Sequence, residues 1–177
     1  MEEPRPQRKL HRLKGYDYSQ NGAYFVTICT KNRAPLLCRV GNAVPGVPPP
    51  VTPTPIGRLV LAAWEKLGKL DPGIHTDAFC LMPNHIHGII FLDYADSASD
   101  AERRGRRSLP EIVRGFKSVT TREYNRLVPA EKKNTLWQGS YYDTVLRSEA
   151  HYLTVRQYID ENPIRWTEDE YFTPPEP

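Results

Sequence analysis

With 177 residues, 39% hydrophobic and 25% charged, the chain has the length and composition of one globular domain and is too short for two. No stretch approaches eighteen consecutive apolar residues and the N-terminus has no apolar core, which excludes a membrane span and a signal peptide and indicates a cytoplasmic protein. The formal net charge is only +3, and the three cysteines lack a C-x-x-C spacing, which argues against a disulfide framework and a cysteine-based zinc site.

The positive charge is concentrated in two blocks, although the net charge is small. Four arginines surround Gly105 within residues 103–107. Such clusters suit phosphate backbones, because each cation that neutralises a phosphate releases condensed counterions. A solvated loop and a solvated tail explain the two blocks equally well on their own. The N-terminal block consists of Arg5, Arg8, Lys9, Arg12 and Lys14.

The first half of the chain predicts one strand, a proline-rich connector and one helix. Residues 24–30 are β-branched and aromatic, as in a strand. Residues 44–55 contain six prolines, which predict a loop insertion with neither helix nor inner strand. Residues 56–70 place apolar side chains at the spacing of an amphipathic helix.

The second half alternates strands and helices. The tight turn Pro83-Asn84 joins two of the strands, which are therefore expected to pair as a hairpin. Ser148 is a natural N-cap for the last helix. The predicted elements are strands over residues 75–82, 85–92 and 141–147, a helix that opens at residue 109 and ends before Pro129, and a helix over residues 149–161.

The resulting order is strand, helix, strand, strand, helix, strand, helix. Its first six elements match the split βαβ, or ferredoxin-like, arrangement, an α+β fold in which two helices cover one face of an antiparallel sheet. We therefore expect a basic N-terminal segment (1–22), one domain (23–166) that contains the proline-rich loop (44–55), and a C-terminal tail (167–177).

His85 and His87 lie at the N-terminal end of the predicted strand over residues 85–92. Because side chains alternate along a strand, both imidazoles point to one face and Ile86 to the other. Two imidazoles converging from a rigid strand can hold a metal ion when another group supplies further ligands. Taken alone, the tripeptide more often marks two half-exposed strand histidines that bind nothing.

The last predicted helix carries a second candidate group. Tyr158 and Asn162 are four residues apart, so a phenol and an amide oxygen lie one turn from each other and can point at the same spot. A tyrosine in such a helix more often packs and hydrogen-bonds at the surface, and the residues alone leave that reading open.

Four motifs, in this order, resemble the IS200-type Y1 transposases and, within them, the REP-associated tyrosine transposases. The resemblance extends from about residue 13 to about residue 166, and the four motifs together are far more specific than His-X-His alone. They are Pro-Asn-His-Ile-His-Gly (83–88), Phe-Lys-Ser (116–118), Trp-Gln (137–138) with Tyr142, Asp143 and Arg147, and Tyr-Ile (158–159) with Asn-Pro (162–163).

The resemblance implies a single-strand DNA nuclease and transesterase of the HUH class, acting on single-stranded or hairpin DNA. His85 and His87 match the metal-binding pair. Tyr158 matches the nucleophile, which becomes joined to the 5′ phosphate and leaves a free 3′ hydroxyl. Asn162 matches the third metal ligand, one turn after the nucleophile. Relatives include monomers and homodimers, so either assembly is open here.

The implied chemistry fits these groups. A phenol with a pKa near 10 needs activation or a polarised target. Two imidazoles and an amide oxygen suit Mg²⁺ or Mn²⁺, which would neutralise charge on the scissile phosphate. Tyr152 is a rival nucleophile, but Arg156 rather than an amide stands one turn after it.

Contacts to the DNA backbone are expected in two places. The helix that opens at residue 109 carries cations that would contact the backbone and two aromatic residues, Phe116 and Tyr124, that would stack on bases. An ordinary amphipathic helix with solvated cations explains the same pattern equally well. The N-terminal basic run would enter a groove of a DNA hairpin or follow its backbone. The expected contacts are Arg8, Lys9, Arg12, Lys14, Arg114, Lys117 and Arg122.

Two other functions remain compatible with the sequence. One is a domesticated DNA- or RNA-binding protein that keeps the fold and has lost strand cleavage. The other is a hydrolase that uses water, with His75 or Asp77 completing a zinc site from the neighbouring strand.

Overall fold

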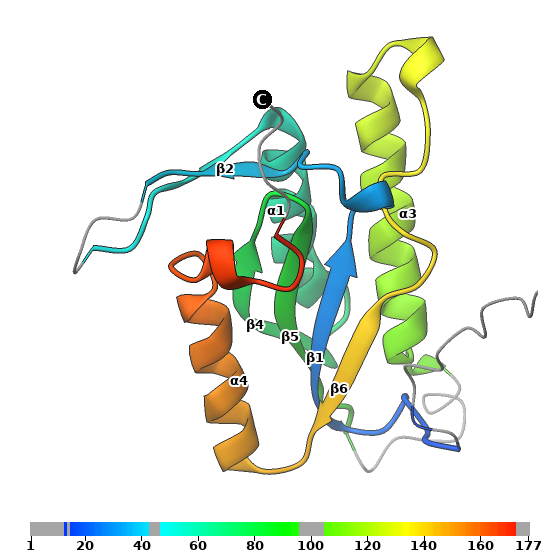
Figure 1. The fold of residues 1–177 in the computed structure, drawn as a ribbon. Coiled ribbons are helices and arrows are strands. Elements are labelled where there is room, and N and C mark those ends of the chain that lie inside the picture. The colour runs from blue at the N-terminus through cyan, green and yellow to red at the C-terminus, as the bar shows by residue number, and fades with distance from the viewer. Residues whose placement is uncertain (1–12, 14, 43–46, 96–104, 173–177) are drawn as a thin grey trace, which may run out of the picture.

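A four-stranded antiparallel sheet forms the centre of the computed structural model, which describes residues 13, 15–42, 47–95 and 105–172 (Figure 1). Its strand order is β4 (Ile74–Leu81), β5 (His85–Leu92), β1 (Gly22–Cys29) and β6 (Tyr142–Leu146). Helices α1 (Pro55–Leu70) and α3 (Leu109–Leu127) cover one face of the sheet, and α4 (Glu149–Glu161) covers the other. The predicted ferredoxin-like arrangement is therefore confirmed.

Strict alternation along the strands builds two separate apolar layers. In β1, Val26 and Ile28 face the core beneath α1 and α3, whereas Phe25 faces α4. In β5, Ile86 joins the first layer and Ile89 the second. An inner strand buried on both faces reads as a continuous apolar run, which is why these strands were recognisable in the sequence.

Gly88 is required by the way α1 packs on β5. A Cβ atom at this position would lie 2.3 Å from the ring of Trp64, which rests directly on the strand. No side chain fits that gap without moving the indole. The glycine that follows His-Ile-His therefore serves the packing of the opposite face.

Each of the three long helices begins at a serine or threonine cap, of which the sequence analysis named only Ser148. The Thr54 side chain accepts a hydrogen bond at the start of α1, with Pro55 at its first position. The Glu111 carboxylate accepts from the Ser108 backbone N–H at 2.8 Å at the start of α3. Ser148 caps α4, as predicted.

The proline-rich connector differs from the prediction. The chain on either side of residues 43–46 forms a two-stranded arm, β2 (Cys38–Val40) and β3 (Val51–Pro53), and Pro55 already belongs to α1 (Figure 1). The expectation of a loop over the whole stretch was wrong because a two-stranded arm has no inner strand, so a proline can end β3 without breaking a ladder. Short 3₁₀ turns lie at Lys31–Arg33, Ala130–Lys132 and Trp166–Glu168.

The other element bounds differ little from those expected. α3 ends at Leu127, before Pro129 as expected, and the strands that differ from the prediction shift by one or two residues. None of the described helices is long and apolar enough to cross a membrane. Most of the basic N-terminal segment, like Arg103 and Arg104, lies outside the described residues.

Candidate active site

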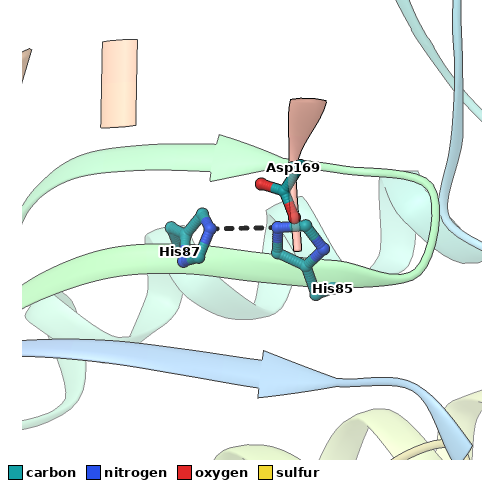
Figure 2. A group of neighbouring side chains, drawn as sticks. All are labelled: His85, His87 and Asp169. Carbon is teal, nitrogen blue, oxygen red and sulfur yellow. Dashed lines mark hydrogen bonds between the residues drawn. The ribbon is translucent and has the colours of Figure 1, made fainter. Parts of the chain in front are cut away.

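Two histidines of β5 lie on the sheet face that α4 covers. β5 is an inner strand between β4 and β1, and alternation sends His85 and His87 to the same face as Ile89. The two residues are 0% and 1% exposed. Their Nε2 atoms are 3.0 Å apart (Figure 2). The two rings therefore converge on one point inside the protein.

Burial keeps both imidazoles neutral. It lowers the pKa of His85 to about 3, with a smaller contribution from the Arg33 guanidinium. The pKa of His87 is also well below its usual value, because of burial and then because of neighbouring His85, although Asp169 opposes the shift. Neutral imidazoles retain the lone pairs that a metal ion needs.

Tyr158 brings a phenol to this pair from α4. Its hydroxyl oxygen lies 3.4 Å from His87 Nε2, and the residue is 41% exposed. Partial burial raises the pKa of Tyr158 to about 12, with the charges of Asp169 and Glu170 adding to the effect and a hydrogen bond from Asn162 opposing it. The phenol is therefore protonated at neutral pH and needs activation to act as a nucleophile.

A carboxylate that the sequence analysis did not single out completes the cluster. Asp169 follows the last 3₁₀ turn, and its ligand atom and those of His85 and His87 all lie within 4.8 Å of one another (Figure 2). Among the described residues, no other three histidine, cysteine or acidic side chains converge in this way. Asp169 lies in an irregular segment, so neither periodicity nor a motif marks it.

Asn162 lies beside the cluster and is turned towards the carboxylate. Its Nδ2 donates to Asp169 Oδ2 at 2.9 Å. Its Oδ1 is buried and meets no donor among the described residues. A buried acceptor without a donor is costly unless a cation or another ligand binds it.

The segment that follows α4 also covers the histidines. The Tyr171 ring lies 4.8 Å from the His85 ring, and the Tyr171 carbonyl accepts from Asn84 Nδ2 at 2.7 Å. Arg33 donates to the Glu170 carbonyl at 3.2 Å and so ties the segment to the 3₁₀ turn that follows β1. Because both imidazoles are at most 1% exposed, a phosphate can reach them only if this segment or α4 shifts.

A cleft of about 560 Å³ opens beside Tyr158, between α4 and the segment after it. Its wall carries four carboxylates and one cation, Arg165, which pairs with Glu161 at 2.9 Å. A phosphate entering this cleft would be repelled unless a cation were bound there. The lining residues are Thr154, Gln157, Tyr158, Glu161, Asn162, Arg165, Glu168, Asp169 and Glu170.

The expected DNA-binding cations are described only in part. Arg114 and Arg122 are exposed on α3, which lies on the sheet face opposite α4. Lys117 instead points its ammonium at the backbone carbonyls of Gln138 and Gly139, where it ties α3 to the chain before β6. The remaining four, Arg8, Lys9, Arg12 and Lys14, lie outside the described residues.

The aromatic residues of α3 were expected to stack on bases, but they pack in the core. Phe116 is 3% exposed and packs between Trp64 and Trp137 in the core. Tyr124 is half-buried and packs against the same core. That expectation was wrong for Phe116 because α3 turns its aromatic side towards the sheet.

The alternative zinc site on β4 is not formed among the described residues. Asp77 accepts a hydrogen bond from the Tyr152 hydroxyl at 2.5 Å and pairs with Arg156 at 3.6 Å. His75 is exposed, and neither residue joins the histidine cluster. The antiparallel pairing sets Cys80 opposite His87 and His75 opposite Phe91, so both candidate residues lie further along β4 from the histidine pair.

Comparisons with known proteins agree with this architecture. A family model described as "Transposase IS200 like" matches residues 68–162, more than half of the chain. A Haemophilus influenzae protein described as uncharacterized is 32% identical over an alignment of 180 positions that covers 93% of each chain. A REP-associated tyrosine transposase, solved bound to a REP hairpin, has a similar fold, with a TM-score of 0.56 and 19% identity over 87% of this chain and 73% of its own.

Proposed function

Because this chain belongs to the family of IS200-like transposases, we propose that it cleaves and rejoins single-stranded DNA through a covalent bond between Tyr158 and a 5′ phosphate. The resemblance inferred from the four motifs is confirmed at the level of the family. The observation that carries the proposal is the 3.4 Å between the Tyr158 hydroxyl and His87 Nε2, which brings a phenol to a buried histidine pair.

The reaction is a transesterification. The Tyr158 oxygen attacks the phosphorus, a tyrosyl ester forms, and the bond from phosphorus to the 3′ oxygen breaks. The phenol loses a proton and the departing 3′ oxygen takes one up, so that no co-reactant is needed. Because the ester keeps the energy of the phosphodiester bond, attack by a 3′ hydroxyl rejoins the strand at the same site.

The side chains present fit a divalent cation. His85 and His87 supply two nitrogen ligands, Asp169 supplies an oxygen, and the buried Asn162 Oδ1 needs a partner. This mixed set suits Mn²⁺ well and Mg²⁺ less well. Such an ion would neutralise charge that develops on the scissile phosphate. The third ligand is then Asp169 or Asn162, and the hydrogen bond between them lets one orient the other.

The DNA is proposed to be a hairpin-forming single strand. The structurally similar transposase was solved with a REP hairpin, and this chain carries exposed cations Arg114 and Arg122 together with its N-terminal basic run. All three cluster residues and Tyr158 lie in one chain, which favours a site that is complete within a monomer.

Covalent capture tests the proposal. With a labelled single-stranded hairpin and Mn²⁺, the native chain should form a protein–DNA adduct that survives denaturation. Tyr158→Phe should abolish the adduct and leave hairpin binding within about twofold, since binding rests largely on phosphate contacts elsewhere. Tyr171→Phe, near the same histidines, is the matched control and should still form the adduct. Adducts persisting in the Tyr158→Phe protein would refute the assignment.

The second candidate is a binding protein of the same fold that no longer cleaves. The closed position of residues 169–171 over the histidines is the observation in its favour. Hairpin binding without an adduct across Mn²⁺, Mg²⁺ and several hairpins would support this function in place of the first.

A further inference from the structure

The tautomer of His85 is fixed by its neighbour in the sequence. The Asn84 Nδ2 group donates to the Tyr171 carbonyl at 2.7 Å, and because a carbonyl only accepts, the orientation of the amide is determined. Asn84 Oδ1 then faces His85 Nδ1 at 2.9 Å. An amide oxygen also only accepts, so His85 carries its proton on Nδ1. Its Nε2 lone pair is free to point at the ligand position.

The same reasoning gives the opposite tautomer for His87. Its Nε2 lies 3.0 Å from the unprotonated Nε2 of His85, so it must carry a proton and donate to that lone pair. His87 Nδ1 is then an acceptor, and the Thr27 hydroxyl, 2.9 Å away, donates to it. β1 places Thr27 directly opposite His87 in the antiparallel pairing. Every imidazole nitrogen is satisfied in this arrangement, which holds without a metal ion.

A metal ion needs a different arrangement, because both Nε2 atoms must offer a lone pair. The His87 proton must then reside on Nδ1, where it needs an acceptor. The Thr27 hydroxyl can supply one, because a hydroxyl rotates and can accept as well as donate. The change moves one proton from Nε2 to Nδ1 of the same ring through exchange with water. The total number of protons bound to the protein stays the same.

We propose that Thr27 is a positioning residue that lets His87 change tautomer when a metal ion binds, while Asn84 holds His85 permanently in the metal-binding tautomer. The inference rests on the proposed metal site, but it concerns Thr27 and Asn84, which are not among the proposed metal ligands. Groups that hydrogen-bond to the far nitrogen of a metal-binding histidine change metal affinity by about 10- to 100-fold when removed.

Nitrogen NMR of the full chain with ¹⁵N-labelled histidine reads the tautomers directly. In the metal-free protein we expect His85 to be protonated on Nδ1 and His87 on Nε2. After addition of diamagnetic Zn²⁺, both should be protonated on Nδ1. A metal-free His87 already protonated on Nδ1 would overturn the inference, as would a tautomer that does not change on metal binding.

Substitution of Thr27 tests the same point through affinity. Thr27→Val keeps the shape and removes the hydroxyl, and should weaken Mn²⁺ binding in calorimetry by about 10- to 100-fold. Thr27→Ser restores the hydroxyl and should bind within about threefold of the native chain. Thr120→Val, on α3, is the matched control. It removes another fully buried hydroxyl, which accepts a hydrogen bond from Trp137 Nε1, and should leave Mn²⁺ affinity unchanged.

The outcomes separate this inference from the proposed function. Native-like Mn²⁺ affinity in a folded Thr27→Val protein, or equal losses in the Ser and Val variants, would overturn the role of Thr27 and leave the nuclease proposal intact. A native chain that binds no Mn²⁺ at all would overturn both. If Thr27→Val fails to fold, the NMR experiment on the native chain still decides.

Discussion

At the scale of single residues, the environment of Tyr158 makes it a poor nucleophile until something activates it. Burial and two nearby carboxylates raise its pKa to about 12, so that at neutral pH nearly all of the phenol is protonated. The neighbouring imidazoles do not take up protons in the same range, because burial lowers the pKa of His85 to about 3 and that of His87 far below its usual value. The response of the site to pH above 6 should therefore come from the phenol.

The rate of adduct formation should accordingly increase with pH. A raised pKa means that the reactive phenolate is scarce and that its fraction rises about tenfold per pH unit below that pKa. Single-turnover rates with saturating hairpin DNA and Mn²⁺ at pH 6 to 9 would measure this. Replacing Tyr158 with 3-fluorotyrosine, a more acidic phenol, should move the profile to lower pH. A flat profile in both proteins would show that phenolate formation does not limit the reaction.

At the scale of elements, α4 is attached to the sheet by few contacts. Ile159 is its only fully buried residue, and Leu153 and Tyr158 are exposed. A polar connection to β4 adds to this apolar packing. The Tyr152 hydroxyl donates to Asp77 at 2.5 Å and accepts from Arg156 at 2.9 Å. The helix that carries the proposed nucleophile is thus held to β4 by a tyrosine hydroxyl as well as by apolar packing.

Removing that hydroxyl should loosen the helix without removing the nucleophile. Tyr152→Phe is expected to lower the free energy of unfolding by about 1 kcal/mol, the usual value of one hydrogen bond, in urea titrations. Adducts should still form, but several-fold more slowly, with hairpin affinity unchanged. Leu153→Ala, an exposed neighbour on α4, is the control and should change neither quantity. An unchanged rate in a destabilised Tyr152→Phe protein would mean that this contact does not position Tyr158.

The sequence predicted the regular elements well and the irregular ones poorly. β1 and β5 are buried on both faces and α4 starts at a serine cap, and such patterns are local, so they could be recognised one at a time. The β2–β3 arm escaped notice because its prolines argue against strands in general. Asp169 escaped notice because an aspartate in an irregular segment is ordinary in sequence and acquires a role only when the chain folds back over β5.

At the scale of the whole molecule, the site is assembled from four distant parts of the chain. β1 contributes Thr27, β5 the two histidines, α4 Tyr158, and the segment after α4 contributes Asp169. That last segment has two separable effects, because it supplies a carboxylate and it also buries the imidazoles. A variant that changes one effect and not the other can distinguish them.

Shortening the chain should therefore change metal affinity and histidine acidity together. A chain ending at Thr167 lacks Asp169 and Tyr171, so it should bind Mn²⁺ about tenfold or more weakly and its imidazole pKa values should rise towards 6.5. Asp169→Asn should lose affinity but keep the depressed pKa values, because the histidines stay covered. A chain ending at Phe172 retains both residues and is the control. Calorimetry and histidine NMR titrations provide the two readouts, and imidazole pKa values that stay depressed in the shortest chain would show that burial by this segment is not their cause.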